Sequence, residues 1–411
     1  MKRSRLSSEY LVADLAELER SGDLTAMIKL LRTAIEVDVR VLAHPVVKTW
    51  AGRRWRYLFL REAVEDDEAL DAASPRRDAR SPRQRIAERF LVENAEQAWQ
   101  DEQPRPLMPR SLDATLLFCP GLLNGLLPMR EFTDGMPAVE RRYSGLRSLR
   151  AESHPARSCE ANVADILQAV LEGKGSDAQA KPIADAKAVP PAHIMALAYS
   201  KGAPDLLTTL ALHPDTAARF RCIFTLAGAI GGSQVADDVA DKYKTLNLEG
   251  NRGKALSIAA RRFAYRVLGE ASAQTKRVDE FDSVAAVHDL TTRVRKAWLS
   301  GHAAQLDALN IPMFTFRGVT SLSEIPLSQK RGYRLIARDE PQSDMQVGAS
   351  ASQLPFPMAT ELAVFHGHHW DVAYPSFRKR RWFNKTYHPF PKTAALTAMV
   401  QLAAEFGLIG R

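Results

Sequence analysis

Cysteine is scarce in this sequence, and its spacing argues against two kinds of protein. The 411 residues contain three cysteines, Cys119, Cys159 and Cys222, and none of them forms a C-x-x-C pair. An odd number without paired spacing argues against a disulfide framework and against a zinc site built from cysteines. A reducing compartment fits this content best, so we expect a cytoplasmic protein.

Long hydrophobic runs are also missing. No uncharged run reaches the roughly 18 residues that a membrane-spanning helix needs. Residues 1–5 are basic, as the start of a signal peptide would be, but residues 6–14 include Ser, Glu and Asp instead of a continuous apolar segment. The sequence therefore predicts no secretion signal and no stable insertion into a membrane.

The charge balance is basic, yet no recognised nucleic-acid-binding motif accompanies it. The formal net charge is +8 at pH 7, and nucleic acid is the least favoured partner. The densest basic group is residues 378–385, where Trp382 and Phe383 stand among the cations. We interpret this group either as a patch for phosphate or lipid headgroups, or as a solvated loop anchored by its aromatic side chains.

The pattern of apolar residues divides the chain into three parts. Residues 1–110 show helical spacings and few strand signals, which predicts an N-terminal helical extension. Residues 111–232 and 310–411 alternate short apolar runs with amphipathic segments, which predicts an α/β core with a mainly parallel sheet. Residues 233–309 are again helical in pattern. They predict either a cap that shapes a substrate pocket or a plain packing layer.

One stretch combines a buried strand, a tight turn and a helix around a single serine. The apolar run 194–199 leads into Ser200, and another apolar segment follows at once. Small residues at Ala198 and Gly202 suit a turn in which strand and helix almost touch. A helix N-terminus beneath Ser200 directs N–H groups toward charge developing on a substrate oxygen. The alternative is a serine that merely caps the helix.

The sequence after Ser200 contains the two further groups that acyl transfer requires. A serine hydroxyl at its ordinary pKa is a poor nucleophile, so it needs a histidine base and a carboxylate that orients the imidazole. Asp344 and His369 follow Ser200 in the order acid, then base. Glu324, which closely follows the strand candidate 311–317, and Asp339 are alternative acids.

Four segments occur in a fixed order along the chain: residues 120–123, 199–202, 343–347 and 368–372. Together they resemble the α/β-hydrolase superfamily, specifically its esterase and lipase branch, from about Leu112 to the C-terminus. The resemblance implies an α/β-hydrolase fold, with a mainly parallel sheet flanked by helices. Two positions depart from the family pattern, since Ala198 and Met345 stand where glycine is usual.

The resemblance also assigns roles to individual residues. Ser200 is the match for the nucleophile, Asp344 for the acid and His369 for the base, with His366 and His368 as rivals to His369. The expected oxyanion hole is formed by backbone N–H groups, one from Lys201 after the nucleophile and one from the loop after an earlier strand. In that loop the candidates are Leu122 and Leu123.

These assignments predict a serine hydrolase that cleaves a carboxylic ester through an acyl-enzyme. The expected partner is a small-molecule or lipid-like ester, and the chemistry requires no metal and no organic cofactor. Two alternatives stay open. The same triad serves an acyltransferase or thioesterase, and the fold also occurs as a binding module without catalysis. The sequence does not indicate an oligomeric state.

Overall fold

A six-stranded parallel sheet forms the centre of the structure, which is a computed structural model. The strands lie in the order β2-β1-β3-β4-β5-β6, and every pairing between neighbours is parallel. The mainly parallel sheet predicted from the sequence is therefore confirmed. The strands are β1 (Ala114–Cys119), β2 (Leu146–Arg150), β3 (Ile194–Tyr199), β4 (Phe220–Leu226), β5 (Met313–Val319) and β6 (Ala359–His366). The structure describes residues 8–73, 78–122, 130–246, 277, 279–375 and 388–410.

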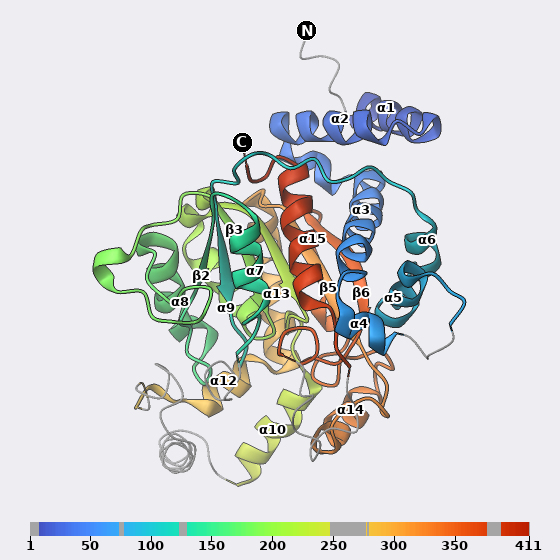
Figure 1. The fold of residues 1–411 in the computed structure, drawn as a ribbon. Helices are drawn as coiled ribbons and strands as arrows, with labels where there is room; N and C mark the ends of the chain where they lie inside the picture. Colours follow the sequence, from blue (N-terminus) through green and yellow to red (C-terminus); the bar gives the residue numbers. More distant parts are fainter. Residues whose placement is uncertain are drawn as a thin grey trace.

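Helices cover both faces of the sheet (Figure 1). Along β3 the side chains alternate between the two faces, so that Met195 and Leu197 join one hydrophobic core while Ala196 and Ala198 join the other. Because both faces are buried, the strands are continuous apolar runs in the sequence. The first core includes α3 (Pro45–Ala63), α7 (Gly135–Arg142) and α15 (Lys392–Glu405), and the second includes α8 (Cys159–Leu167), α9 (Gly202–Leu212) and α13 (Thr292–Ala308).

The N-terminal residues contribute α3 to a layer that covers the sheet. Trp55 of α3 is fully buried, and its ring centroid lies 5.2 Å from that of Phe59 and 5.5 Å from that of Phe365 on β6. Arg54 of α3 forms an ion pair with Glu405 of α15 at 2.6 Å, with both side chains buried. The other helices before the sheet are α1 (Ser8–Ser21), α2 (Leu24–Val37), α4 (Asp67–Ala72), α5 (Pro82–Phe90) and α6 (Ala95–Gln100).

Short segments pair with both edges of the sheet. At the β6 edge, the N–H of Val92 donates to the carbonyl of Val364 at 2.9 Å. At the β2 edge, Arg150 and Ser176 exchange two backbone hydrogen bonds of 2.8 and 3.0 Å. Each edge strand therefore has a backbone partner outside the sheet.

The segment predicted as a cap contains helices in two different places. Figure 1 shows α10 (Gln234–Thr245) and α12 (Ser283–Asp289) at one end of the sheet, near α14 (Lys330–Ile336). In contrast, α13 packs with α9 on a face of the sheet. Residues 247–276 and the basic group 378–385 lie outside the described residues, so the division into three parts stays a prediction. None of the described helices is both long and apolar enough to cross a bilayer.

Candidate active site

Ser200 occupies a sharp turn between β3 and α9. Its φ is +53°, in the left-handed region that residues other than glycine rarely adopt. Three hydrogen bonds hold this turn. The N–H of Ser200 donates to the carbonyl of Leu226 at 3.2 Å, and its carbonyl accepts from the N–H groups of Ala203 and Ala229 at 3.2 and 3.1 Å. The surrounding backbone therefore imposes the conformation that presents the serine hydroxyl.

The residues around the turn are small because neighbouring atoms leave no room. A Cβ atom at Gly202 would lie 2.1 Å from the carbonyl oxygen of Cys119. A Cβ at Gly121 would lie 2.9 Å from the Cβ of Ser200. Ala198 is fully buried and packs in the core between β3 and α9, where its methyl group is accommodated although glycine is usual at this position of the elbow.

The structure brings Ser200, His369 and Asp344 together in one hydrogen-bonded series. His369 Nε2 lies 2.8 Å from Ser200 Oγ, and His369 Nδ1 lies 2.6 Å from Asp344 Oδ2. A carboxylate accepts hydrogen bonds and cannot donate them, so Nδ1 is the donor to Asp344. The lone pair of Nε2 then faces the serine hydroxyl. All three residues are buried. This arrangement allows the histidine to take the serine proton.

The backbone around Asp344 fixes the direction of its carboxylate. Oδ1 accepts hydrogen bonds from the N–H groups of Gln346 and Val347 at 2.9 and 2.8 Å, which leaves Oδ2 for His369. Met345 follows with φ of +80°, the left-handed conformation for which glycine is usual. The side chain of Met345 is fully buried. Its packing in the core therefore holds a backbone conformation that is unfavourable for methionine.

The structure does not bring the other two carboxylates to His369. Glu324 instead lies 2.7 Å from His366 Nε2 and accepts a hydrogen bond from Arg89 at 3.1 Å. The hydrogen bond with His366, and then the charge of Arg89, lower the pKa of Glu324 below its usual range. Asp339 is exposed. Of the three candidate acids, only Asp344 contacts the histidine that contacts Ser200.

The two rival histidines have other partners. His366 lies beside Glu324, as described above. His368 is buried, its Nδ1 accepts from the N–H groups of Trp370 and Asp371 at 3.2 Å, and its Nε2 lies 3.2 Å from Asp371 Oδ1. Burial lowers the pKa of His368 to about 4, so the ring is neutral at pH 7. Its contacts order the loop that carries His369.

Two of the three predicted oxyanion residues lie within the described part of the chain. Leu122 lines the cavity that contains Ser200 and His369. Lys201 begins the turn into α9, where backbone N–H groups lack partners within the helix. Its side chain is buried and bound to Asp205 at 2.6 and 2.9 Å. Leu123 lies outside the described residues.

A largely apolar cavity of about 250 Å³ opens beside Ser200. Residues from α10 and α12 form part of its wall, so two helices of the predicted cap contribute to it. No Lys, Arg, Asp or Glu lines this cavity among the residues that the structure describes. The lining includes Leu122, Ala229, Val235, Ala236, Val239, Val287, Leu290, Val347, Trp370 and Tyr374.

One contact that supports His369 has no signal in the sequence. The hydroxyl of Tyr199, the last residue of β3, donates to the backbone carbonyl of His369 at 2.7 Å. Tyr199 is buried and its ring centroid lies 5.1 Å from that of His369. The two residues are 170 positions apart, and no sequence signal connects them. Only the folded sheet reveals that the residue before the nucleophile also holds the histidine loop.

Comparisons with known proteins bear on the fold. No protein-family model and no curated protein matches the sequence. Among solved structures, a metagenomic carboxyl esterase is 22% identical with a TM-score of 0.59, covering 85% of this chain and 90% of its own. A lipase from Bacillus licheniformis is 19% identical, with a TM-score of 0.37 and 66% and 88% coverage. Lipase 1 from Pelosinus fermentans is 13% identical, with a TM-score of 0.42 and 63% and 93% coverage.

The sheet and the first of these structures lead to the same assignment. Six parallel strands lie between two layers of helices, and the serine turn follows the central strand β3. The esterase shares this architecture over most of both chains. The fold implied by the sequence resemblance is thereby confirmed. The chain has the α/β-hydrolase fold.

Proposed function

We propose that this chain is a serine hydrolase that cleaves a carboxylic ester through an acyl-enzyme. The observation that carries the proposal is the series Asp344, His369 and Ser200, joined at 2.6 and 2.8 Å beside an open cavity. The left-handed φ of Ser200 supports it, because strain of this kind clusters at active sites. The name of the solved esterase with the same fold agrees with this activity.

The same three side chains act in both halves of the proposed reaction, formation and hydrolysis of the acyl-enzyme. Ser200 Oγ attacks the ester carbonyl while His369 Nε2 accepts the hydroxyl proton, and Asp344 stabilises the resulting imidazolium. The N–H groups of Lys201 and of Leu122 or Leu123 stabilise the oxyanion. The intermediate collapses as His369 returns the proton to the leaving alcohol. A water molecule, activated by the same histidine, then releases the acid and restores Ser200.

The cavity indicates the class of ester. A volume of about 250 Å³ is slightly below the roughly 300–1,000 Å³ typical of pockets for drug-sized ligands. Its lining is mainly aliphatic and aromatic, with Ser233, Gln329 and Gln346 as polar exceptions. Burial of apolar surface therefore favours an uncharged acyl group of short to medium length. We propose such esters as substrates.

The decisive experiment compares hydrolysis of p-nitrophenyl butyrate and p-nitrophenyl palmitate by the wild type and by Ser200→Ala. We expect turnover of the butyrate ester to exceed that of palmitate, and to fall by at least about a thousandfold in Ser200→Ala. Ser300→Ala is the control, because Ser300 is exposed on α13. A fluorophosphonate probe is expected to label the wild type and Ser300→Ala only. Unchanged turnover by Ser200→Ala contradicts the proposal.

Product analysis separates hydrolysis from the two alternatives. With butanol added as a competing acceptor, a hydrolase releases mainly butyric acid, whereas an acyltransferase forms mainly the butyl ester. A thioesterase would prefer the matched thioester. A binding module would give neither product and would not react with the fluorophosphonate.

A further inference from the structure

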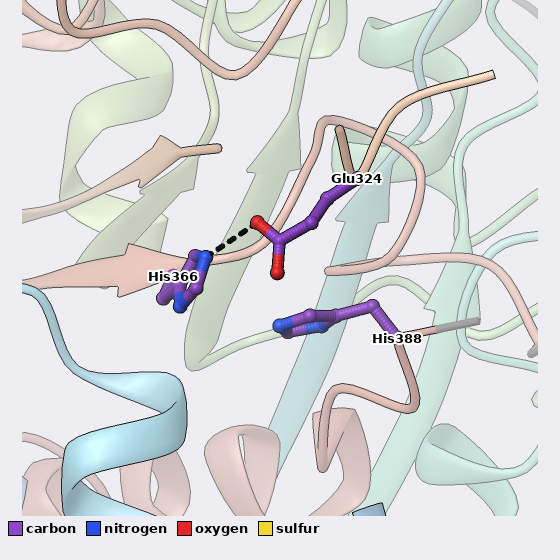
Figure 2. Close-up of side chains that lie close together, drawn as sticks. All are labelled: Glu324, His366 and His388. Carbon is purple, nitrogen blue, oxygen red and sulfur yellow. Dashed lines mark hydrogen bonds and ion pairs between the residues drawn. The ribbon is translucent and has the colours of Figure 1, made fainter. Parts of the chain in front are cut away.

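Three side chains outside the proposed triad form a cluster of metal-ligating groups. Glu324 follows β5, His366 ends β6, and His388 lies shortly before α15. One oxygen or nitrogen from each lies within 4.8 Å of those of the other two. Figure 2 shows the three side chains converging from different segments, with Glu324 bonded to His366. The proposed ester chemistry assigns no role to any of them.

His388 is the observation that points to a missing ligand. Its side chain is almost fully buried, with 4% of the residue exposed, and neither ring nitrogen has a hydrogen-bond partner within the described part of the chain. Nδ1 lies 3.8 Å from Asp371 Oδ2, which is too long for a hydrogen bond. Buried polar groups are nearly always satisfied in folded proteins. The two nitrogens of His388, which lack a partner within the described part of the chain, therefore point to a ligand at this position.

His366 has neighbours that suit it both with and without a metal ion. Nε2 lies 2.7 Å from Glu324 Oε2. Nδ1 lies 3.3 Å from Arg89 Nη1 and 3.1 Å from the Arg89 carbonyl. Without metal, Nε2 donates to Glu324 and Nδ1 accepts from the guanidinium. When an ion replaces the proton on Nε2, Nδ1 donates to the carbonyl instead, as the second nitrogen of a metal-bound histidine usually does.

We propose that Glu324, His366 and His388 bind one divalent transition-metal ion of the zinc type. Two imidazoles and one carboxylate form a ligand set that zinc uses, with water in the fourth position. Calcium and magnesium prefer oxygen ligands throughout, so the two histidines disfavour them. The side chains of Glu324 and His366 are 25% and 29% exposed, which leaves a route for the ion and its water.

The proposed ion would connect segments that surround the catalytic histidine. His366 precedes His369 by three residues, and Gly367 between them donates its N–H to the carbonyl of Val319 at the end of β5. Asp371, which faces His388 Nδ1, also contacts His368. An ion bound here would therefore join the ends of β5 and β6 to the segment before α15, and act as a positioning element for the His369 loop.

The test is metal binding by the full-length chain after removal of metals with a chelator. Titration with Co²⁺ is followed by its visible absorption, and Zn²⁺ is then added as a competitor. We expect one equivalent to bind, Zn²⁺ to displace Co²⁺, and the affinity to fall by at least about tenfold in Glu324→Gln and His366→Asn. His193→Asn serves as the control, because His193 lies before β3, at the opposite end of the sheet from the triad.

Two further measurements keep the result interpretable. Glu324 and His366 are partly exposed, so we expect both variants to fold, as judged by circular dichroism, and to lose the rise in melting temperature that Zn²⁺ gives the wild type. His369→Asn is expected to bind Co²⁺ like the wild type, which excludes binding at the triad. Wild-type binding in Glu324→Gln and His366→Asn, or no binding by the wild type, overturns the proposal. Neither result affects the proposed ester hydrolysis.

Discussion

At the scale of single residues, the candidate site concentrates backbone strain. Ser200, in the turn between β3 and α9, and Met345, which follows Asp344, have φ values of +53° and +80°. A residue other than glycine in this region costs about 1–3 kcal/mol. The cost is tolerated because hydrogen bonds from Ala203 and Ala229 fix the turn, and burial fixes Met345. The backbone conformations that position Ser200 and Asp344 are thus kept although they lower local stability.

The role of Asp344 gives a prediction at this scale. Asp344→Asn keeps the size of the side chain but no longer stabilises an imidazolium or selects the tautomer with Nδ1 protonated. We expect kcat for p-nitrophenyl butyrate to fall by about ten-thousandfold, with little change in KM. Asp339→Asn is the matched control, since Asp339 is exposed and is expected to leave the rate unchanged. A comparable loss in Asp339→Asn would contradict the assignment of the acid.

At the scale of secondary structure, the start of α9 lies against the end of β1, the strand beside β3. A Cβ at position 202 would lie 2.1 Å from the carbonyl oxygen of Cys119, the last residue of β1. We expect Gly202→Ala to lower the free energy of unfolding by about 1–3 kcal/mol and to reduce hydrolysis, because the backbone must move. Urea unfolding and ester turnover are the measurements.

Gly301→Ala provides the matched control for this change. Gly301 lies within α13 and has no atom within 4 Å of the position of an added Cβ. For Gly301→Ala we expect the free energy of unfolding to rise by roughly 0.5–1 kcal/mol, because alanine is more favourable than glycine inside a helix. Equal effects of the two substitutions would show that the contact with Cys119 does not limit position 202.

Elements whose signal is local could be predicted from the sequence. The mainly parallel sheet and the strand 194–199 before Ser200 are present, and the serine, acid and base candidates converge in the structure. Contacts between distant segments could not be predicted where no family pattern indicates them. Glu324, His366 and His388 are separated by 42 and 22 positions, far from any recognised ligand spacing, which is why the sequence predicted no metal site. The contact of Tyr199 with the His369 loop was hidden for the same reason.

At the scale of the whole molecule, a buried ion pair joins the N-terminal and C-terminal parts of the chain. Arg54 on α3 and Glu405 on α15 are both fully buried and form two hydrogen bonds of 2.8 and 2.6 Å. We expect Glu405→Leu alone to cost about 3–5 kcal/mol of stability, because it leaves a buried charge unpaired. Chemical denaturation measures the difference.

The double variant is the control for this pair. Arg54→Met combined with Glu405→Leu removes both charges, and we expect it to be more stable than Glu405→Leu alone. If the double variant is instead less stable by the sum of the two single changes, the two residues act independently and the pair does not couple the ends of the chain.

The segments that contain Val92 and Ser176, which pair with the outer strands β6 and β2, also affect self-association of the protein. An uncovered strand offers free N–H and C=O groups, which a strand of another molecule can pair with. Val92 and Ser176 already use such groups on β6 and β2. These segments therefore cover part of each outer strand, and a strand of another molecule can pair at Val364 or Arg150 only after the segment there detaches.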